Sequence, residues 1–199
     1  MARSSRADAD RHKTEVLKAA VEFIAEHDPG SLTIPKAMAA AGLTSGGFYN
    51  HFASKDDFLS QVVDLAFDTQ KVAVDAVSSS HFHELRPTLA AMAARYLSTP
   101  DNRDPRLGIS VLVLSSETST ETPESATRRA YARGLNGLVD HLTALKDPDA
   151  SHREKRRLVL ATLSALAGAS AISRALPDKE LASELLEATQ SLIAGRPAA

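Results

Sequence analysis

Apolar residues recur along most of this chain at intervals of three and four positions. That spacing gathers them on one face of an α-helix. No segment keeps the strict alternation of apolar and polar residues that marks a half-buried strand. The pattern therefore predicts an all-α protein with about nine helices, whose ends are marked by Ser, Thr or Asp caps and by glycine or proline. The expected caps are Thr33, Thr122, and two capping boxes, Ser54 with Asp57 and Ser151 with Glu154. Asp56 and Asp57 are interpreted as acidic residues at the N-terminus of their own helix.

The predicted helices form a group of three short ones followed by a bundle of longer ones. They cover about residues 10–27, 33–41, 45–51, 54–72, 87–97, 108–116, 122–146, 151–176 and 178–195. The length of 199 residues fits one compact unit or two small domains. We predict an N-terminal domain over residues 1–54 and a C-terminal helical bundle over residues 55–199.

Residues 32–52 have the spacing of a helix-turn-helix, with Gly42 in the turn. Interior contacts are expected from Ala37, Met38, Ala41, Leu43, Phe48 and Phe52. The other face carries small or hydrogen-bonding residues, namely Thr44, Ser45, Gly46, Gly47, Tyr49, Asn50 and His51. A recognition helix needs a slim N-terminal end to enter the major groove, and two glycines are otherwise costly in so short a helix. The alternative is that the glycines only loosen a loop and that Tyr49 and His51 are ordinary packed residues.

Four motifs in this region carry a resemblance to a known family. Thr-Ile at 33–34, Ala-Gly-Leu-Thr at 41–44, Gly-Phe-Tyr-Asn-His-Phe at 47–52 and Ser-Lys-Asp at 54–56 occur in the order found in the tetracycline-repressor (TetR) family of transcriptional regulators. The sequence resembles that family well over about residues 11–60, and elsewhere only in length and number of helices. The resemblance implies a homodimer that binds a palindromic double-stranded DNA operator, with a small-molecule inducer site in the bundle. It implies a repressor that the inducer releases. A cytoplasmic location is expected separately, from the polar, charged start of the chain and the lack of a long apolar run.

The resemblance also assigns roles to residues by their position. Phosphate contacts would come from Thr33, Tyr49, His51 and Lys55. Base readout or close backbone approach would come from Thr44, Ser45, Gly46, Gly47 and Asn50. The ligand pocket would be lined by Phe67, Met92, Tyr96, Leu112, Glu117 and Tyr131, each of which is also an ordinary core candidate. A basic arm, or simply a solvated chain start, would comprise Arg3, Arg6, Arg11 and Lys13.

The charge balance limits how the chain can bind DNA. It has 23 Lys+Arg against 25 Asp+Glu, and residues 1–60 hold 7 basic and 8 acidic residues. No broad basic field is expected, so binding would depend on helix N-termini, a few hydroxyls and Lys55. Few phosphates would then be neutralised per subunit, and the affinity should fall only gently with salt.

Two apolar faces of the bundle predict self-association. The segment 158–172 is almost wholly apolar and small, and the last helix offers a second apolar stripe. That stripe comprises Leu181, Leu185, Leu186, Leu192 and Ile193. Two such helices from each of two subunits would form a four-helix interface. Burial inside a single subunit is the alternative.

Other classes of function find less support in the sequence. The chain has no cysteine, which excludes disulfides, thiol nucleophiles and Cys-ligated zinc. No apolar run approaches the roughly 20 residues of a membrane span. Gly42 to Gly46 carries Thr44 where a nucleophile elbow needs its serine, and His81 and His83 lack a nearby third metal ligand. We expect no enzyme, no cofactor and no metal. A helical dimeric adaptor that does not bind DNA stays an alternative, with a small-molecule enzyme behind it.

Overall fold

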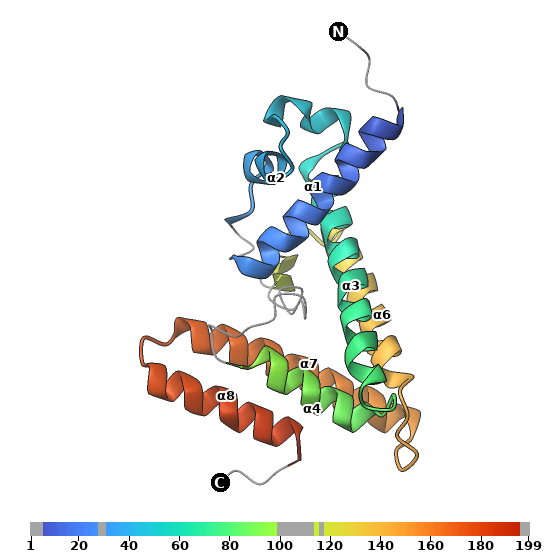
Figure 1. Ribbon diagram of the computed structural model, residues 1–199, viewed down its shortest axis with the longest axis vertical. Helices are drawn as coiled ribbons and strands as arrows, with labels where there is room; N and C mark the ends of the chain where they lie inside the picture. Colours follow the sequence, from blue (N-terminus) through green and yellow to red (C-terminus); the bar gives the residue numbers. More distant parts are fainter. Residues whose placement is uncertain (1–5, 28–30, 99–113, 116–117, 196–199) are drawn as a thin grey trace. The chain divides into compact units, whose positions relative to one another are not determined.

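The computed structural model describes residues 6–27, 31–98, 114–115 and 118–195. Eight helices are defined in these residues (Figure 1), which confirms the all-α class and comes close to the predicted number. They are α1 (Arg6–Glu26), α2 (Ile34–Ala40), the 3₁₀-helix η2 (Ser45–Asn50), α3 (Lys55–Ser79), α4 (Leu85–Tyr96), α6 (Ala126–Thr143), α7 (His152–Ala175) and α8 (Lys179–Ile193). The helix predicted at 108–116 lies outside the described residues except for Leu114 and Ser115, which are helical.

The chain forms two compact units. Unit 1 comprises residues 1–68 and 114–134, and unit 2 comprises residues 69–113 and 135–199. Both α3 and α6 contribute residues to each unit. Unit 1 therefore combines the helix-turn-helix segment with the first half of α6, which lies about 70 residues further along the chain.

In unit 1, a capping threonine and a turn glycine set the two ends of α2. The Thr33 hydroxyl accepts a hydrogen bond from the Lys36 amide at 3.4 Å and caps the helix, as predicted. Gly42 has φ +71°, a conformation that glycine adopts without a steric penalty. The Leu43 amide then donates to the Met38 carbonyl at 2.9 Å and closes the turn. Met38 is buried, and α2 and η2 contact each other on either side of this turn.

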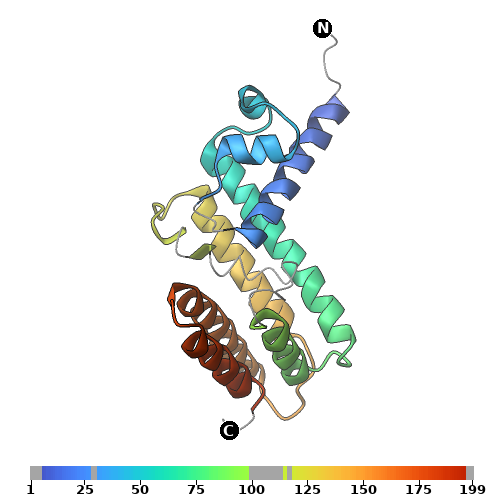
Figure 2. The same cartoon turned by 60° about the vertical axis from the view of Figure 1, so that its left-hand side comes forward.

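In unit 2, α4, α7 and α8 pack against one another (Figure 2). Ser151 and Glu154 form the predicted capping box at the start of α7, and the hydrogen bonds from Ser151 lower the pKa of Glu154. Asp178 caps α8. Large apolar side chains remain exposed on α7 and α8, including Ile172 at 52% and Leu192 at 74%. These faces are therefore not covered within unit 2 as described.

Helix α7 is the one described helix that is long and apolar enough to cross a membrane by length and composition alone. Its mean hydropathy is 1.5 over the most apolar 18-residue window, and 33% of that window is buried. A core helix of a globular domain has the same composition, and α7 packs against both α4 and α8.

The start of α6 differs from the prediction. The sequence predicts a cap at Thr122 and a helix from Pro123, whereas α6 begins at Ala126. The Ser125 hydroxyl accepts from the Arg128 amide at 3.0 Å and acts as the local cap. The prediction was wrong because a contact from α3, described below, fixes the first two amides of α6.

Candidate nucleic-acid interface

Three phenylalanines hold the helix-turn-helix segment in place. Phe48 on η2, Phe52 after it and Phe58 on α3 are each at most 2% exposed. Their ring centroids lie 5.1 Å (Phe48 to Phe52), 5.5 Å (Phe48 to Phe58) and 4.9 Å (Phe52 to Phe58) apart. Tilted and edge-on aromatic pairs at these distances add stability beyond the area they bury. The cluster fixes η2 against the start of α3 within unit 1.

Several residues between these phenylalanines face solvent, among them Tyr49, Asn50 and Lys55. Tyr49 is 74% exposed, and its ring meets Phe48 edge-on at 5.2 Å. The candidates for DNA contact that are exposed are Thr33, Thr44, Ser45, Gly46, Tyr49, Asn50 and Lys55. Gly47 and His51 are half-buried. The structure thus brings the candidates of 44–51 together on one short element, which is a 3₁₀-helix rather than an α-helix.

Packing within the chain does not require glycine at position 46 or 47 of η2. A Cβ atom added at Gly46 would meet nothing within 4 Å, and one added at Gly47 would lie 3.8 Å from the Met38 Cε atom, an ordinary contact. Both residues have negative φ, so the backbone conformation does not require glycine either. Neither the packing nor the backbone conformation therefore requires a glycine at the exposed Gly46 or at the half-buried Gly47.

Lys55 stands at the first residue of α3. The Ser54 hydroxyl accepts from the Asp57 amide at 3.0 Å, and the Asp57 carboxylate accepts from the Ala53 amide at 3.0 Å. This is the predicted capping box, with the carboxylate reaching one residue further back than usual. Lys55 is exposed and forms no ion pair with any residue that the structure describes. Its ammonium group is available to an anion from outside the chain.

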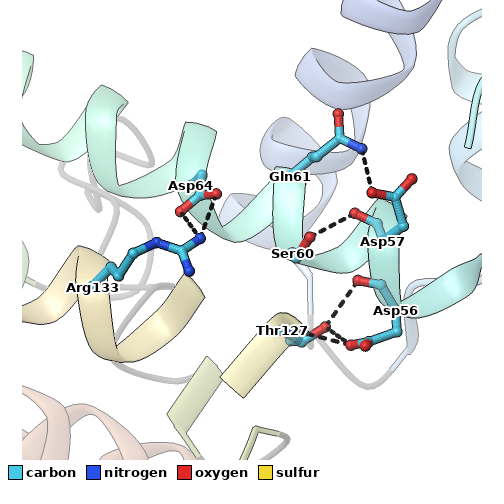
Figure 3. Close-up of polar contacts among 7 residues, drawn as sticks. All are labelled: Asp56, Asp57, Ser60, Gln61, Asp64, Thr127 and Arg133. Carbon is cyan, nitrogen blue, oxygen red and sulfur yellow. Dashed lines mark hydrogen bonds and ion pairs between the residues drawn. The ribbon is translucent and has the colours of Figure 1, made fainter. Parts of the chain in front are cut away.

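Asp56 points away from its own helix and binds the start of α6 (Figure 3). One carboxylate oxygen accepts from the Ala126 amide at 2.7 Å, and the other accepts from the Thr127 amide at 2.9 Å and the Thr127 hydroxyl at 2.7 Å. Burial raises the pKa of Asp56, but the hydrogen bonds from Thr127 and Ala126 outweigh it and hold that pKa below its ordinary value. Sequence reasoning treated Asp56 as a charge for its own helix and missed Thr127, because no local pattern marks a partner 71 residues away.

A second contact joins the same two helices in unit 1. Arg133 on α6 donates to both carboxylate oxygens of Asp64 on α3, at 3.1 and 3.3 Å (Figure 3). Both side chains are largely exposed, so this pair adds little stability. The Asp56 contact, one carboxylate with three donors, is the stronger tie between α3 and the first turn of α6.

The expected basic arm is wrong for two of its four residues. Arg11 lies within α1 and pairs with Asp8 at 3.1 Å and with Glu15 at 3.8 Å. Lys13 also lies in α1, and its ammonium group is 5.5 Å from the centroid of the Phe52 ring. Arg3 and the side chain of Arg6 lie outside the described residues. Helix α1 forms earlier than predicted because Arg6 to Asp10 contains no helix breaker.

The ligand candidates are only partly brought together. In unit 1, the Phe67 and Tyr131 rings meet at 5.6 Å, and burial raises the pKa of Tyr131 while a hydrogen bond with Ser115 acts in the opposite direction. In unit 2, Met92 is buried and Tyr96 half-buried on α4. Leu112 and Glu117 lie outside the described residues.

The histidines of the turn after α3 are occupied within that turn. His81 Nδ1 lies 2.8 Å from the Val77 carbonyl oxygen, and His83 Nδ1 lies 3.3 Å from the Ser78 hydroxyl oxygen. Within the described part of the chain, no group of three or more His, Asp or Glu residues is placed to hold a metal ion.

Residues 16–62 match the family model described as bacterial regulatory proteins, tetR family. The helix-turn-helix segment of the chain therefore carries the sequence pattern of the TetR family. The fold of the chain matches a TetR-family transcriptional regulator from Cytophaga hutchinsonii with a TM-score of 0.71 and 17% identity, over 97% of this chain and 98% of that one. Reduced NemR of E. coli matches with a TM-score of 0.66 and 17% identity, over 93% and 97% of the chains.

FadR of Bacillus subtilis, solved in complex with stearoyl-CoA, has the same fold, with a TM-score of 0.53 and 18% identity over 89% of this chain and 97% of FadR. Identities this low establish the shared fold alone. No curated protein matches the sequence. The matched residues 16–62 run from the middle of α1 to the first two turns of α3 and include the helix-turn-helix segment.

Replacing Asp56 by asparagine is expected to lower the free energy of unfolding by about 1–2 kcal/mol at pH 7. The amide keeps one acceptor oxygen, loses the charge and turns an NH₂ group toward an α6 amide. Because the folded-state pKa of Asp56 is lowered, the stability that it contributes is complete above the ordinary pKa of about 4 and is lost as pH falls through the folded value. Urea unfolding at pH 7 and at pH 3 measures both effects.

The matched control is Asp64→Asn, the same chemical change on the same helix in an exposed ion pair. We expect this variant to lose at most about 0.5 kcal/mol at pH 7. Equal losses for the two variants, or an Asp56→Asn loss that does not shrink with acid, would contradict the role given to Asp56.

Proposed function

We propose that this protein is a DNA-binding transcriptional regulator of the TetR type that binds a palindromic operator as a homodimer. One observation carries the proposal: the face of η2 and the first residue of α3 expose side chains that the fold does not use. Tyr49, Asn50 and Lys55 are exposed beside a buried aromatic cluster that holds them rigidly. Rigid support under an exposed polar face is the arrangement that a recognition element needs.

The roles of the residues follow from their chemistry. Lys55, Tyr49, His51 and Thr33 would contact phosphates and fix the register on the duplex. Close backbone approach or base readout would fall to Thr44, Ser45, Gly46, Gly47 and Asn50. We assign residues 1–54 to DNA binding and residues 55–199 to ligand binding and dimerisation.

The dimer is proposed from the exposed apolar residues of α7 and α8. Leu160, Ile172, Leu181 and Leu192 are each at least 40% exposed, which is an unfavourable surface for an isolated helix pair in water. A second copy of the same surface would cover them by two-fold symmetry. The two recognition elements would then meet half-sites about one helical turn, or a multiple of it, apart.

The regulator is proposed to act as a cytoplasmic repressor that a small molecule releases. The FadR structure with stearoyl-CoA shows that this fold can hold a small molecule in another protein. Phe67 and Tyr131, which meet in unit 1, and Met92 and Tyr96 in unit 2 are the described candidates for such a pocket here.

Selection of bound sequences from a random pool of DNA duplexes tests the proposed function whatever the operator sequence is. With the full-length protein, we expect an enriched inverted repeat, and light scattering should give twice the 21.2 kDa mass of the chain. A protein that dimerises but enriches no sequence would overturn the DNA-binding proposal in favour of an adaptor. A monomer in solution would overturn the dimer.

A further inference from the structure

Two histidines of unit 1 meet beside the proposed DNA-contact surface. His12 lies on α1 and His51 directly follows η2, and their ring centroids are 6.2 Å apart at an interplanar angle of 85°. Both residues are half-buried. The 3₁₀-helix η2 itself holds one titratable group, the phenol of the exposed Tyr49. The roles proposed above give His51 a phosphate contact and give His12 none.

His12 occupies a core position of its helix. Val16, Ala20 and Ile24 follow one another at intervals of four residues and are at most 3% exposed. His12 lies one turn before Val16 on the same face of α1. An apolar residue at this position would simply extend the buried stripe. The sequence instead ends the stripe with an ionisable ring that lies against a second one.

The ring nitrogens of these two histidines differ from those of most other histidines in the chain. Four of the seven histidines have a ring nitrogen within 3.3 Å of a carbonyl, hydroxyl or carboxylate oxygen, namely His27, His81, His83 and His141. Neither His12 nor His51 forms a side-chain hydrogen bond with a residue that the structure describes. Their ring nitrogens can therefore serve a group from outside the chain.

The carboxylates on the neighbouring elements have other partners. On α1, Asp8 and Glu15 both pair with Arg11, at 3.1 and 3.8 Å. At the start of α3, Asp56 binds the first amides of α6, and Asp57 caps its own helix. Within the described part of the chain, no ion pair joins these carboxylates to either histidine. They therefore supply no fixed counter-ion for a protonated imidazole.

The neighbouring cations oppose protonation of the pair in the free protein. The ammonium group of Lys13 on α1 lies 5.5 Å from the centroid of the Phe52 ring, and that ring lies 6.3 Å from the ring of His51. Lys55 stands exposed four residues after His51, whereas Lys36 of α2 binds a carbonyl of its own segment. Like charges disfavour the charged form of a histidine. A negative group from outside reverses this balance, because it stabilises all of these cations together.

We propose that His12 and His51 bind one DNA phosphate per subunit as a protonated pair, so that DNA binding takes up protons. This inference rests on the proposed function and adds His12 to its contacts. Rings this close can both donate to the oxygens of one phosphate group. A phosphodiester stays negative between pH 5 and 8, whereas imidazole is the side chain that gains a proton in that range.

The direction of the pH effect follows from this linkage. A bound phosphate favours the charged form of each imidazole, so the DNA complex holds its protons up to a higher pH than the free protein does. The affinity for DNA is therefore greatest at low pH and falls as pH rises through the range in which the bound pair releases its protons. The near-neutral charge of residues 1–60 makes these two protons a large share of the positive charge at the interface.

Fluorescence anisotropy on the selected duplex at pH 6 and pH 8, at constant salt, tests the proton uptake. We expect the unaltered protein to bind at least about tenfold more tightly at pH 6. His12→Gln and His51→Gln keep a hydrogen-bonding side chain that does not titrate, and each should lose most of this ratio. His152→Gln, at an exposed residue of α7, should keep it. Equal affinities at the two pH values, or the full ratio in both His12→Gln and His51→Gln, would overturn the pair.

Nuclear magnetic resonance of the imidazole C–H signals, without DNA, separates the pair from the proposed function. Inorganic pyrophosphate is the probe, and the two glutamine variants assign the signals. Pyrophosphate should raise the titration midpoints of His12 and His51 and leave that of His141, which already contacts Asp75 at 2.7 Å, in place. Unmoved midpoints for both would overturn the pair. Raised midpoints in a protein that selects no DNA sequence would disprove the proposed function and leave the anion-binding pair intact.

Discussion

The Gly134→Ala variant is expected to lose about 1–3 kcal/mol of folding free energy. A Cβ atom at this position would lie 2.0, 2.4 and 2.6 Å from the Cδ2, Cγ and Cε2 atoms of Phe67. The ring is 1% exposed and packs edge-on against Tyr131, so it cannot move aside without disturbing unit 1. The overlap outweighs the gain of up to about 1 kcal/mol that alanine brings over glycine inside a helix.

Gly168→Ala is the matched control, because it makes the same change inside helix α7. An added Cβ at Gly168 meets nothing within 4 Å, so this variant should be neutral or more stable by up to about 1 kcal/mol. Urea unfolding of both variants measures the difference, and Phe67→Leu in the Gly134→Ala background should restore part of the loss. Equal stability of the two alanine variants would refute the close approach of α6 to Phe67.

The Gly46→Glu variant is expected to weaken DNA binding by at least about 100-fold, since a like charge at an interface costs several kcal/mol. The carboxylate would stand on the exposed face of η2, where the duplex backbone is proposed to pass. The fold should tolerate the side chain, because nothing lies within 4 Å of a Cβ at Gly46. Fluorescence anisotropy on the selected duplex measures the affinity, and thermal unfolding checks the fold.

Two further variants separate the local effect of that change from its general ones. Gly46→Gln adds the same bulk without charge and should lose less affinity than Gly46→Glu. Ser80→Glu adds the same charge at an exposed turn residue of unit 2 and should bind DNA like the unaltered protein. If Ser80→Glu weakened binding as much as Gly46→Glu, the effect would reflect net charge rather than contact at η2.

Features that depend on neighbours in the chain could be predicted from the sequence. The caps at Thr33, Ser54 and Ser151 and the left-handed turn at Gly42 are short-range chemistry, and the structure has them where they were expected. The burial of Phe48 and Phe52 and the exposure of Tyr49 could also be predicted from the sequence, because apolar residues three or four positions apart share a helix face.

Features that depend on distant partners could not be predicted. From the sequence, Asp56 is interpreted as an acidic residue in the first turn of α3. Its contact with the amides of Ala126 and Thr127 exists only in the folded chain. Because Asp56 binds these two amides, α6 begins at Ala126 and not at Pro123, although proline is favourable at the first position of a helix.

The central claim is that η2 and the first residue of α3 form the DNA-contact surface, and the salt dependence of DNA binding tests it most directly. Lys55 and Lys179 make a matched pair, because each is an exposed lysine at the first residue of a capped helix. Replacing either by alanine removes one positive charge per chain. Only Lys55 belongs to the proposed surface.

Affinity for the selected duplex should be measured over a series of salt concentrations for the unaltered protein, Lys55→Ala and Lys179→Ala. The proposed surface predicts that Lys55→Ala binds more weakly and that its slope of log K against log salt is shallower by about 1 per subunit, the loss of one phosphate contact. Lys179→Ala should match the unaltered protein in both. Identical affinities and slopes for the two variants would contradict the claim.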